Sequence, residues 1–219
     1  MTPVRVFIGY DPRQPVAFQV AAHSVWKYAS APVSITRLQL NQLPLTRQGL
    51  TEFTYSRFLV PYLSNYEGVS IFLDSDTICQ ADICVLLGYP LAYPDIPVFV
   101  SKNPQRFEWP SVMVFQNNLC RILTPEYIEK QPCFDFVWAT SIGDLPREWN
   151  HLVGYDTPNP EAKLIHYTQG VPCWPETRHC EHSQAWKALL AETMATVPFE
   201  TLMGRSVHVK HMKKQAVDG

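Results

Sequence analysis

The sequence has neither a strong excess of one charge nor a long apolar run. Its 219 residues carry 18 basic and 20 acidic side chains, a formal net charge of −2 at pH 7. This balance argues against nucleic acid or an anionic membrane as the main partner. No apolar run approaches the roughly 20 residues of a membrane-spanning helix, and the first run is interrupted at Arg5, too short for a signal peptide. We therefore expect a cytoplasmic protein, with peripheral membrane association left open.

The cysteines do not form a CxxC pair. They are spread through apolar surroundings, which indicates reduced thiols rather than a disulfide framework. The six are Cys79, Cys84, Cys120, Cys133, Cys173 and Cys180. The segment CWPETRHCEH brings Cys173 and Cys180 close to His179 and His182 in sequence. Its spacing matches no structural zinc motif, so ordinary thiols and surface imidazoles are favoured, with zinc as an open alternative.

Hydrophobic periodicity predicts a single α/β domain. A strand over residues 4–8, a helix over 15–28 and a strand over 33–40 make a βαβ unit, which favours a parallel sheet. Residues 69–73 are apolar at nearly every position, as expected for a central strand covered on both faces. Further expected elements are a helix over 52–63 that Pro61 bends or ends, a helix starting at Thr124-Pro125-Glu126, a helix over 182–195, and strands over 97–101, 111–115 and 163–167.

Two aspartates follow the predicted central strand in VSIFLDSDTICQADI, residues 69–83. Residues i and i+2 of an extended chain point to the same side, so Asp74 and Asp76 should emerge together at the carboxyl end of the strand. Ligands of open α/β sheets bind at this edge. Two neighbouring carboxylates repel each other, and a hard divalent cation such as Mg²⁺ or Mn²⁺ relieves that repulsion. The alternative is an acidic turn in which Asp76 caps the loop.

Two further side chains are candidates on weaker grounds. His166, in LIHYTQG, ends a short apolar strand, and imidazole suits Mn²⁺ better than Mg²⁺. Taken alone, it fits a hydrogen-bonded core histidine at least as well. Arg57 interrupts an apolar helical segment, and its guanidinium suits a carboxylate or a diphosphate. An ion pair on a solvated helix face is the alternative.

The turn after the first strand could receive a nucleotide. Gly9 permits a close backbone approach, Tyr10 could stack on a base, and Asp11 could accept a hydrogen bond from a ribose or a base. The turn does not match the GxGxxG fingerprint of dinucleotide-binding folds. A plain strand-to-helix turn with Asp11 near the helix cap is the alternative.

Together these segments resemble the retaining glycosyltransferases of family 8, the glycogenin and galactosyltransferase group with a GT-A type fold. The resemblance runs from Val4 to about Trp174. It rests on four segments: VRVFIGYD, TYSRFLVPYLSNYEGVSIFLDSDTICQADI, LPREWN and HYTQGVPCW. The second segment is the most specific, because it joins the Arg57 helix to the strand that carries the two aspartates.

The resemblance implies one GT-A domain with a mostly parallel twisted sheet and flanking helices. Residues 1–100 would form a Rossmann-like nucleotide-sugar-binding half, residues 101–200 the acceptor half, and residues 201–219 a basic tail. Asp74 and Asp76 would be the catalytic residues, and together with His166 they would hold Mn²⁺ or Mg²⁺. The ion would bridge the diphosphate of a nucleotide sugar, a UDP-sugar in the first instance. The acceptor would be a glycan, a lipid-linked glycan or a protein.

The resemblance also implies roles for residues around the donor. Arg57 would face the diphosphate or the acidic motif, and Ser75 would lie near the ribose or the donor sugar. Uracil and ribose would lie against the first turn, and the late histidine motif would add a glycine. These nucleotide-sugar-binding positions are Ile8, Gly9, Tyr10, Asp11 and Gly170.

The late motif of the family, His-x-x-Gly-x-x-Lys-Pro-Trp, is only partly matched. Trp174 keeps its spacing from His166, but the glycine comes one position late at Gly170, and Pro172 stands in place of the lysine. Lys163 or the basic tail would then have to supply the missing phosphate contact. The chain therefore looks like a distant branch of the family.

Two alternatives belong to other functional classes. One is a non-catalytic nucleotide-sugar-binding protein, an interpretation that the missing lysine keeps open. The other is a haloacid-dehalogenase-like phosphatase, whose nucleophile motif is also an apolar strand followed by Asp-x-Asp. That family needs Thr or Val where this chain has Ile78, and a paired acidic motif where SIGDLP offers one aspartate.

Overall fold

The structure is a computed structural model that describes residues 2–103 and 107–195. The expected basic tail, residues 201–219, lies outside the described residues. No helix in the described ranges has the length and apolar character needed to cross a membrane. The α-helices and strands are β1 (Val4–Gly9), α1 (Pro15–Tyr28), β2 (Val33–Leu38), α2 (Val60–Leu63), β3 (Val69–Leu73), β4 (Thr77–Cys79), α3 (Gly88–Ala92), β5 (Val98–Val100), β6 (Val112–Gln116), α4 (Pro125–Lys130), β7 (Ile142–Asp144), β8 (His151–Leu152), β9 (Leu164–His166) and α5 (Ser183–Met194).

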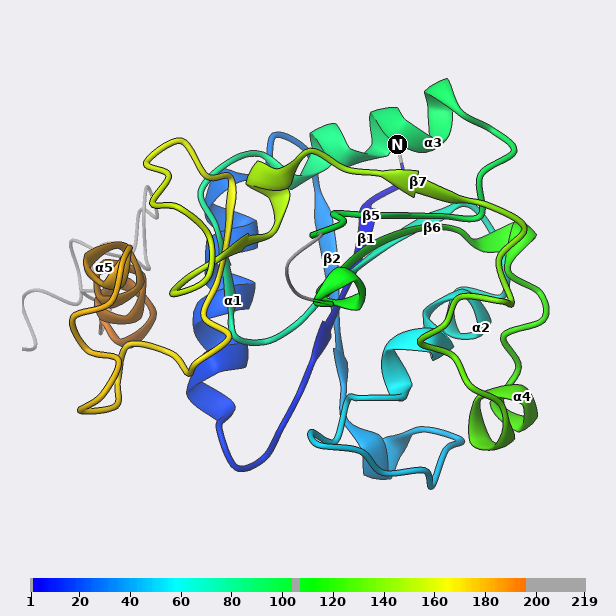
Figure 1. Ribbon diagram of the computed structural model, residues 1–219, viewed down its shortest axis with the longest axis horizontal. Coiled ribbons are helices and arrows are strands. Elements are labelled where there is room, and N and C mark those ends of the chain that lie inside the picture. The colour runs from blue at the N-terminus through cyan, green and yellow to red at the C-terminus, as the bar shows by residue number, and fades with distance from the viewer. Residues whose placement is uncertain (1, 104–106, 196–219) are drawn as a thin grey trace, which may run out of the picture.

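A six-stranded sheet in the order β2-β1-β3-β6-β5-β7 runs through the centre of the described chain (Figure 1). Strand β1 pairs in parallel with β2 and β3, and β5 pairs in parallel with β7, whereas β6 is antiparallel to both of its neighbours. The predicted mostly parallel sheet is therefore confirmed. Strand β3 places Ile71 and Leu73 in one core cluster and Phe72 in another. Both faces of β3 are covered, which explains its continuous apolar sequence.

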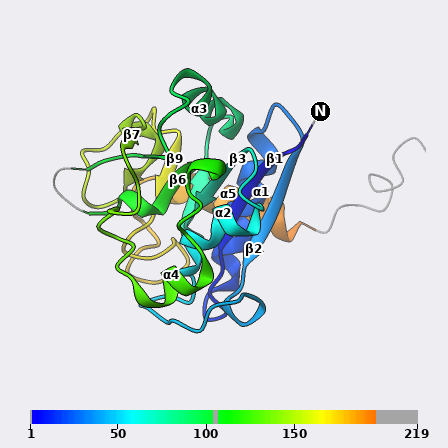
Figure 2. The same cartoon turned by 90° about the vertical axis from the view of Figure 1, so that its right-hand side faces the viewer.

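Helices cover both faces of this sheet. Helix α1 lies on one side, and α2 and α4 lie on the other (Figure 1). Seen from the side, α3 and α4 lie at opposite ends of the molecule (Figure 2). Helix α1 begins with Pro15 in its first turn, where the fixed φ and the missing N–H are both tolerated. Its Ala17 and Val20 pack with Trp186 and Leu189 of α5, which holds α5 on the outer side of α1.

A second sheet, in the order β4-β9-β8, begins immediately after the turn that contains the two aspartates. Strand β4 pairs antiparallel with β9 in a register that sets Thr77 opposite His166. The backbone N–H of Tyr167 continues this pairing and donates to the carbonyl of Asp76 at 2.9 Å. A short sheet therefore carries the late histidine of the sequence to the acidic turn.

The single helix expected over residues 52–63 is wrong. The chain forms turns, then a 3₁₀ helix at Ser56–Leu59 and then α2, in which Pro61 lies in the first turn. In a continuous helix Pro61 would lie in the interior, where its ring would clash with the preceding turn and remove one hydrogen bond. Restarting the helix at Val60 avoids both effects.

Candidate functional site

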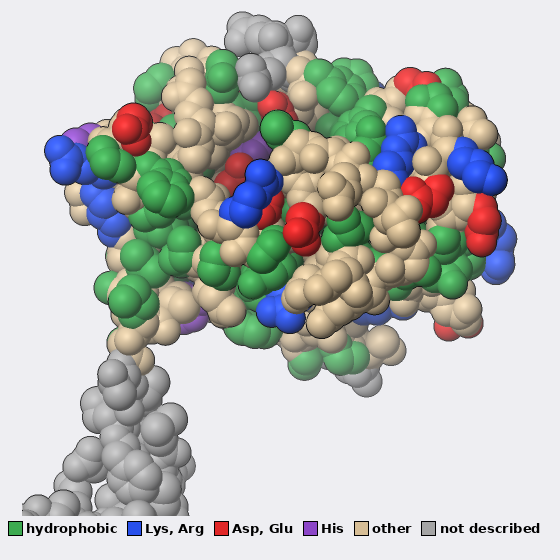
Figure 3. Space-filling view, turned by 90° about the horizontal axis from the view of Figure 1, so that it is seen from below, with side chains coloured by type: hydrophobic (Ala, Val, Ile, Leu, Met, Phe, Trp, Pro, Cys, Tyr) green, Lys and Arg blue, Asp and Glu red, His purple; other side chains and the backbone are tan. Residues whose placement is uncertain are grey.

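Asp74 and Asp76 form a turn at the carboxyl end of β3. The backbone N–H of Asp74 donates to the carbonyl of Ser111 at 2.9 Å, and the Thr77 hydroxyl donates to the carbonyl of Asp74 at 2.8 Å. These bonds fix the turn from both sides. Asp74 is buried and Asp76 is half-buried. Figure 3 looks onto this end of the sheet and shows acidic and histidine side chains in a recess beside basic ones.

His166 presents its Nε2 atom to this turn. The Asn150 side chain amide donates to the carbonyl of Glu108 at 3.0 Å, so its oxygen must face the other way, 3.1 Å from His166 Nδ1. An oxygen can only accept, which assigns the proton to Nδ1 in the neutral ring and leaves a lone pair on Nε2. The Nε2 atom lies 3.4 Å from Asp76 Oδ1. Such outer-shell bonds commonly orient metal-ligating imidazoles.

The three side chains Asp74, Asp76 and His166, here the DxD cluster, fit a divalent metal ion. Each offers a ligand atom within 4.8 Å of the others. The Oδ1 atoms of both aspartates are buried and accept no hydrogen bond from the described residues. Buried carboxylate oxygens that accept no hydrogen bond are unfavourable, and a hard cation such as Mn²⁺ or Mg²⁺ would satisfy them.

Burial and neighbouring charges shift the pKa values of two groups in the DxD cluster. Burial raises the pKa of Asp74 to about 6, against the opposing effect of the Arg57 guanidinium, and the charge of Asp76 adds to the increase. Burial alone would lower the pKa of His166, but the neighbouring carboxylates of Asp76 and Asp74 outweigh it, and the pKa is raised. Both raised pKa values indicate that the buried carboxylates are more stable beside positive charge, which a bound cation would supply.

Arg57 faces the acidic motif rather than open solvent. Its Nη2 lies 3.1 Å from Asp74 Oδ1, in ion-pair range but without hydrogen-bond direction, so Oδ1 keeps a free lone pair. Its Nη1 donates to the carbonyl of Pro110 at 2.9 Å, and its Nε donates to the carbonyl of Thr54 at 3.1 Å. A guanidinium held on three sides and only 7 % exposed is a fixed charge behind Asp74.

Two adjoining pockets meet at Asp76. The first, of 280 Å³, contains the DxD cluster and Arg57 and has aromatic walls from Phe53, Phe107 and Phe134. The second, of 360 Å³, is lined by Asp11, Arg13, Gln14, Thr51, Phe53, Ser75, Asp76 and Trp174. The shared residues Thr51, Phe53 and Asp76 make the two pockets one groove across the carboxyl ends of β1 and β3. Such a groove can hold an elongated ligand with a metal ion at its middle.

The turn after β1 contributes unevenly to this groove. Asp11 lines the larger pocket, where its carboxylate accepts hydrogen bonds from Arg13. A side chain at Gly9 would meet the Phe53 ring at 2.4 Å, so glycine is needed for that ring to form the pocket wall. Tyr10 lines neither pocket. The centroid of its ring lies 5.7 Å from that of Phe18 and 4.6 Å from the Arg37 guanidinium carbon.

The other predicted binding positions also differ in their exposure to the groove. Ser75 lines the larger pocket, but the Ile8 side chain is fully buried in the core and can offer only its backbone. Gly170 has φ +110°, and a side chain there would approach the Trp174 ring at 3.4 Å. Gly170 therefore leaves room for the Trp174 ring, which lines the larger pocket.

A second group of histidine and carboxylate side chains lies nearby. It consists of His151, Glu181 and His182, here the histidine cluster. Glu181 accepts from the backbone N–H of Asn159 at 2.9 Å, and its oxygens lie 2.9 Å from His151 Nε2 and 3.1 Å from His182 Nε2. Of the four cysteine and histidine side chains considered for zinc, His182 belongs to this group; Cys173 is exposed and Cys180 is half-buried.

Three residues in or next to the pockets were not identified from the sequence as site residues. Asn150 orients His166, Phe53 forms the wall between the pockets, and Arg13 faces Asp11. Only Asn150 carried a signal, because it ends the LPREWN segment. The others lie on loops, whose side-chain direction periodicity does not predict.

Solved structures of glycosyltransferases share this fold. WbbM, a bifunctional glycosyltransferase, is 19% identical with a TM-score of 0.63, over 92% of this chain and 51% of its own. GlyE of Streptococcus pneumoniae TIGR4 is 14% identical with a TM-score of 0.64, over 98% of this chain and 64% of its own. LgtC, a galactosyltransferase solved with donor and acceptor sugar analogues, is 11% identical with a TM-score of 0.58, over 90% of this chain and 99% of its own. The chain thus spans about half of WbbM and under two thirds of GlyE, and its fold is of the GT-A type.

The family of the chain follows from a sequence comparison. No model of a known protein family matches it. Protein CDI of Arabidopsis thaliana is 32% identical over 221 aligned positions, which cover 84% of this chain and 85% of that protein. The chain belongs to the family of Protein CDI.

Proposed function

We propose that this protein is a metal-dependent glycosyltransferase that transfers a sugar from a nucleotide sugar, a UDP-sugar in the first instance, to a glycan, lipid-linked or protein acceptor. The observation that carries the proposal is the DxD cluster, in which two buried carboxylate oxygens that accept no hydrogen bond from the described residues lie with one imidazole nitrogen at the junction of two pockets. The GT-A fold supports the reaction class, because the neighbours in fold are glycosyltransferases.

Asp74, Asp76 and His166 would hold Mn²⁺ or Mg²⁺. When bound, the ion would supply positive charge beside the diphosphate as the bond to the sugar breaks. The protein residues do the remaining work. Asn150 holds the His166 ring with Nε2 toward the site, and Arg57 holds Asp74 in place.

The two pockets suit different chemical groups, the nucleoside and a sugar ring. The larger one contains Asp11, which the family resemblance assigns to the nucleoside, and Ser75, which it assigns to the ribose or the donor sugar, with Trp174 as an aromatic wall. The smaller one has three phenylalanine walls, which suit the apolar face of a sugar ring and exclude water from it. Retention of anomeric configuration is proposed on the family resemblance, and no protein nucleophile is assigned.

The proposal is tested by donor turnover. Wild-type protein should hydrolyse or transfer sugar from at least one member of a panel of UDP-, GDP- and CMP-sugars in the presence of Mn²⁺, and chelation should stop the reaction. Asp76→Ala should abolish Mn²⁺-dependent donor binding, because it removes a ligand atom from the junction of the pockets. Unchanged donor affinity in Asp76→Ala would contradict the proposal.

A non-catalytic nucleotide-sugar-binding protein is the second candidate. Pro172 favours it, because proline stands in place of the lysine that the family's late motif carries. Mn²⁺-dependent donor binding without turnover, across the donor panel and a panel of acceptors, would select this candidate.

A further inference from the structure

The proposed donor site needs a basic side chain for the diphosphate, and among the described residues neither Lys163 nor Arg57 is free to provide it. Lys163 directly precedes β9, at the opposite end of the strand from His166. It lines neither pocket, and its Nζ donates to Glu148 Oε1 at 3.2 Å. Arg57 is fixed behind Asp74 by its other hydrogen bonds. A phosphate contact from either would require that these bonds break.

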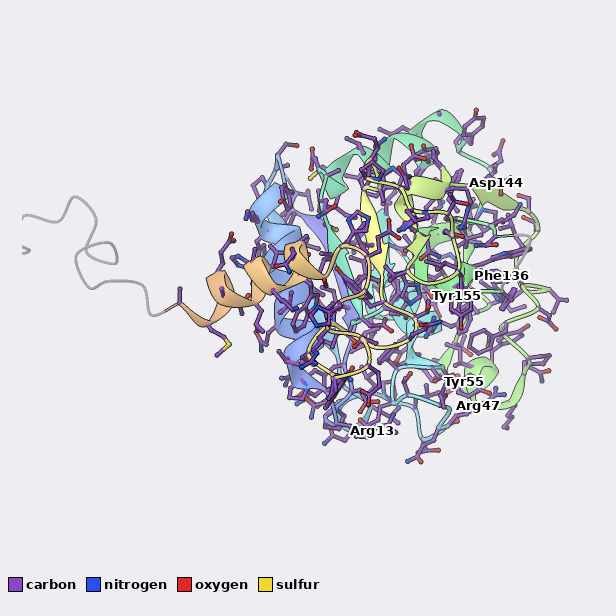
Figure 4. The ribbon with its side chains drawn as sticks, turned by 60° about the vertical axis from the view of Figure 1, so that its left-hand side comes forward. Arg13, Arg47, Tyr55, Phe136, Asp144 and Tyr155 are labelled. Carbon is purple, nitrogen blue, oxygen red and sulfur yellow. The ribbon has the colours of Figure 1, made fainter. Side chains whose placement is uncertain are left out.

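Arg13 lies where that cation is needed. It belongs to the loop between β1 and α1 and lines the 360 Å³ pocket together with Ser75, Asp76 and Trp174. Among the described residues that line the two pockets, Arg13 and Arg57 are the basic side chains. The Arg13 side chain is 69% exposed, at the lower edge of the molecule in Figure 4. It is therefore accessible to a ligand in a way that Arg57 is not.

Asp11 fixes the direction of the Arg13 guanidinium. Arg13 Nε donates to Asp11 Oδ1 at 2.9 Å, and Nη2 donates to Asp11 Oδ2 at 2.5 Å and to the carbonyl of Leu50 at 2.9 Å. The Arg13 hydrogen bonds hold the pKa of Asp11 below its ordinary value, so the carboxylate stays charged. Within the described part of the chain, Nη1 has no hydrogen-bond acceptor. Its two N–H groups are free while the rest of the fork is held.

We infer that Arg13 binds the diphosphate of the nucleotide sugar through its free Nη1 donors, in the role that Pro172 leaves open, with Asp11 as its positioning residue. The inference rests on the proposed function. A guanidinium keeps its charge at all physiological pH values and pairs well with phosphate oxygens. An arginine that a carboxylate already orients loses little side-chain entropy when it binds, which favours the phosphate contact.

The test compares ligands with and without phosphate. UDP and GDP binding in the presence of Mn²⁺ is measured by calorimetry on wild type, Arg13→Ala, Arg13→Lys and Arg121→Ala, and uridine or guanosine binding by ligand-observed NMR. Arg121 is exposed, lies over the Tyr66 ring and lines neither pocket, so its variant controls for the loss of one positive charge. Arg13→Ala should weaken diphosphate binding at least about tenfold and leave nucleoside binding within about twofold. Arg13→Lys should fall between, since it keeps the charge without the fork.

The outcomes separate this inference from the proposed function. If wild type binds neither UDP nor GDP with Mn²⁺, the proposed function fails and the inference fails with it. If wild type binds and Arg13→Ala binds equally well, only the inference is overturned. Equal losses for nucleoside and diphosphate would also overturn it, because they would assign Arg13 to the base or the ribose. Should Arg13→Ala not fold, Arg13→Lys gives the same comparison with a smaller effect.

Discussion

The DxD cluster and the histidine cluster use similar ligand atoms, each around a histidine on one of the neighbouring strands β9 and β8, but differ in how those atoms are satisfied. In the histidine cluster both Glu181 oxygens take part in hydrogen bonds, with His151 Nε2 and with the backbone N–H of Asn159. In the DxD cluster the Oδ1 atoms of Asp74 and Asp76 have basic neighbours, Arg57 and His166, but accept no hydrogen bond from the described residues. The donor types alone therefore do not distinguish a metal site from a structural polar cluster. What distinguishes them is whether the fold leaves buried ligand atoms without hydrogen bonds beside a pocket.

The largest expected difference between the clusters is in metal binding. Asp76→Asn keeps the shape of the side chain but removes its charge, and we expect it to abolish Mn²⁺ binding. Glu181→Gln should leave Mn²⁺ binding unchanged, because the ligand atoms of the histidine cluster already form hydrogen bonds with one another and with the backbone. In thermal unfolding, wild type and Glu181→Gln should gain about 2.7 kcal/mol at a Mn²⁺ concentration of 100 times Kd, and Asp76→Asn should gain nothing. The reverse pattern would assign the metal to the histidine cluster.

A smaller effect is expected from the residue behind His166. Asn150→Ala removes the acceptor that holds the proton on Nδ1, so the imidazole is free to rotate or to change tautomer. We expect Mn²⁺ affinity to fall about 10- to 100-fold without complete loss, as for other outer-shell partners of metal ligands. Calorimetry of the folded variant with Mn²⁺ measures the change. An affinity equal to that of wild type would mean that Asn150 acts only in packing.

The same contrast separates what the sequence could predict from what it could not. Strand β1, helix α1 and strand β3 follow from local periodicity, and the pair Asp74 and Asp76 follows from the end of β3. The position of His166 does not, because it depends on the pairing of β4 with β9, two three-residue strands far apart in the chain. Segments this short carry little periodicity, so the residues alone made His166 a weak candidate, and the family resemblance strengthened it. Neither source supplied Arg13, whose direction depends on hydrogen bonds to Asp11 within the same loop and to the carbonyl of Leu50, which is distant in sequence.

The smallest effect should be on stability, and it should come from the histidine cluster. Glu181→Gln should destabilise the fold by about 1–2 kcal/mol at pH 7, because hydrogen bonds to a charged acceptor are weakened. The pKa of Glu181 is lowered in the fold: burial opposes the shift, but the hydrogen bonds from His151 and Asn159 outweigh it. A lowered pKa contributes stability that is complete above the unfolded value and is lost as pH falls through the folded value. The difference between wild type and Glu181→Gln in urea unfolding should therefore shrink between pH 7 and pH values below about 4. A difference that is independent of pH would mean that the carboxylate charge does not stabilise the segment before α5, and that the cluster acts through shape alone.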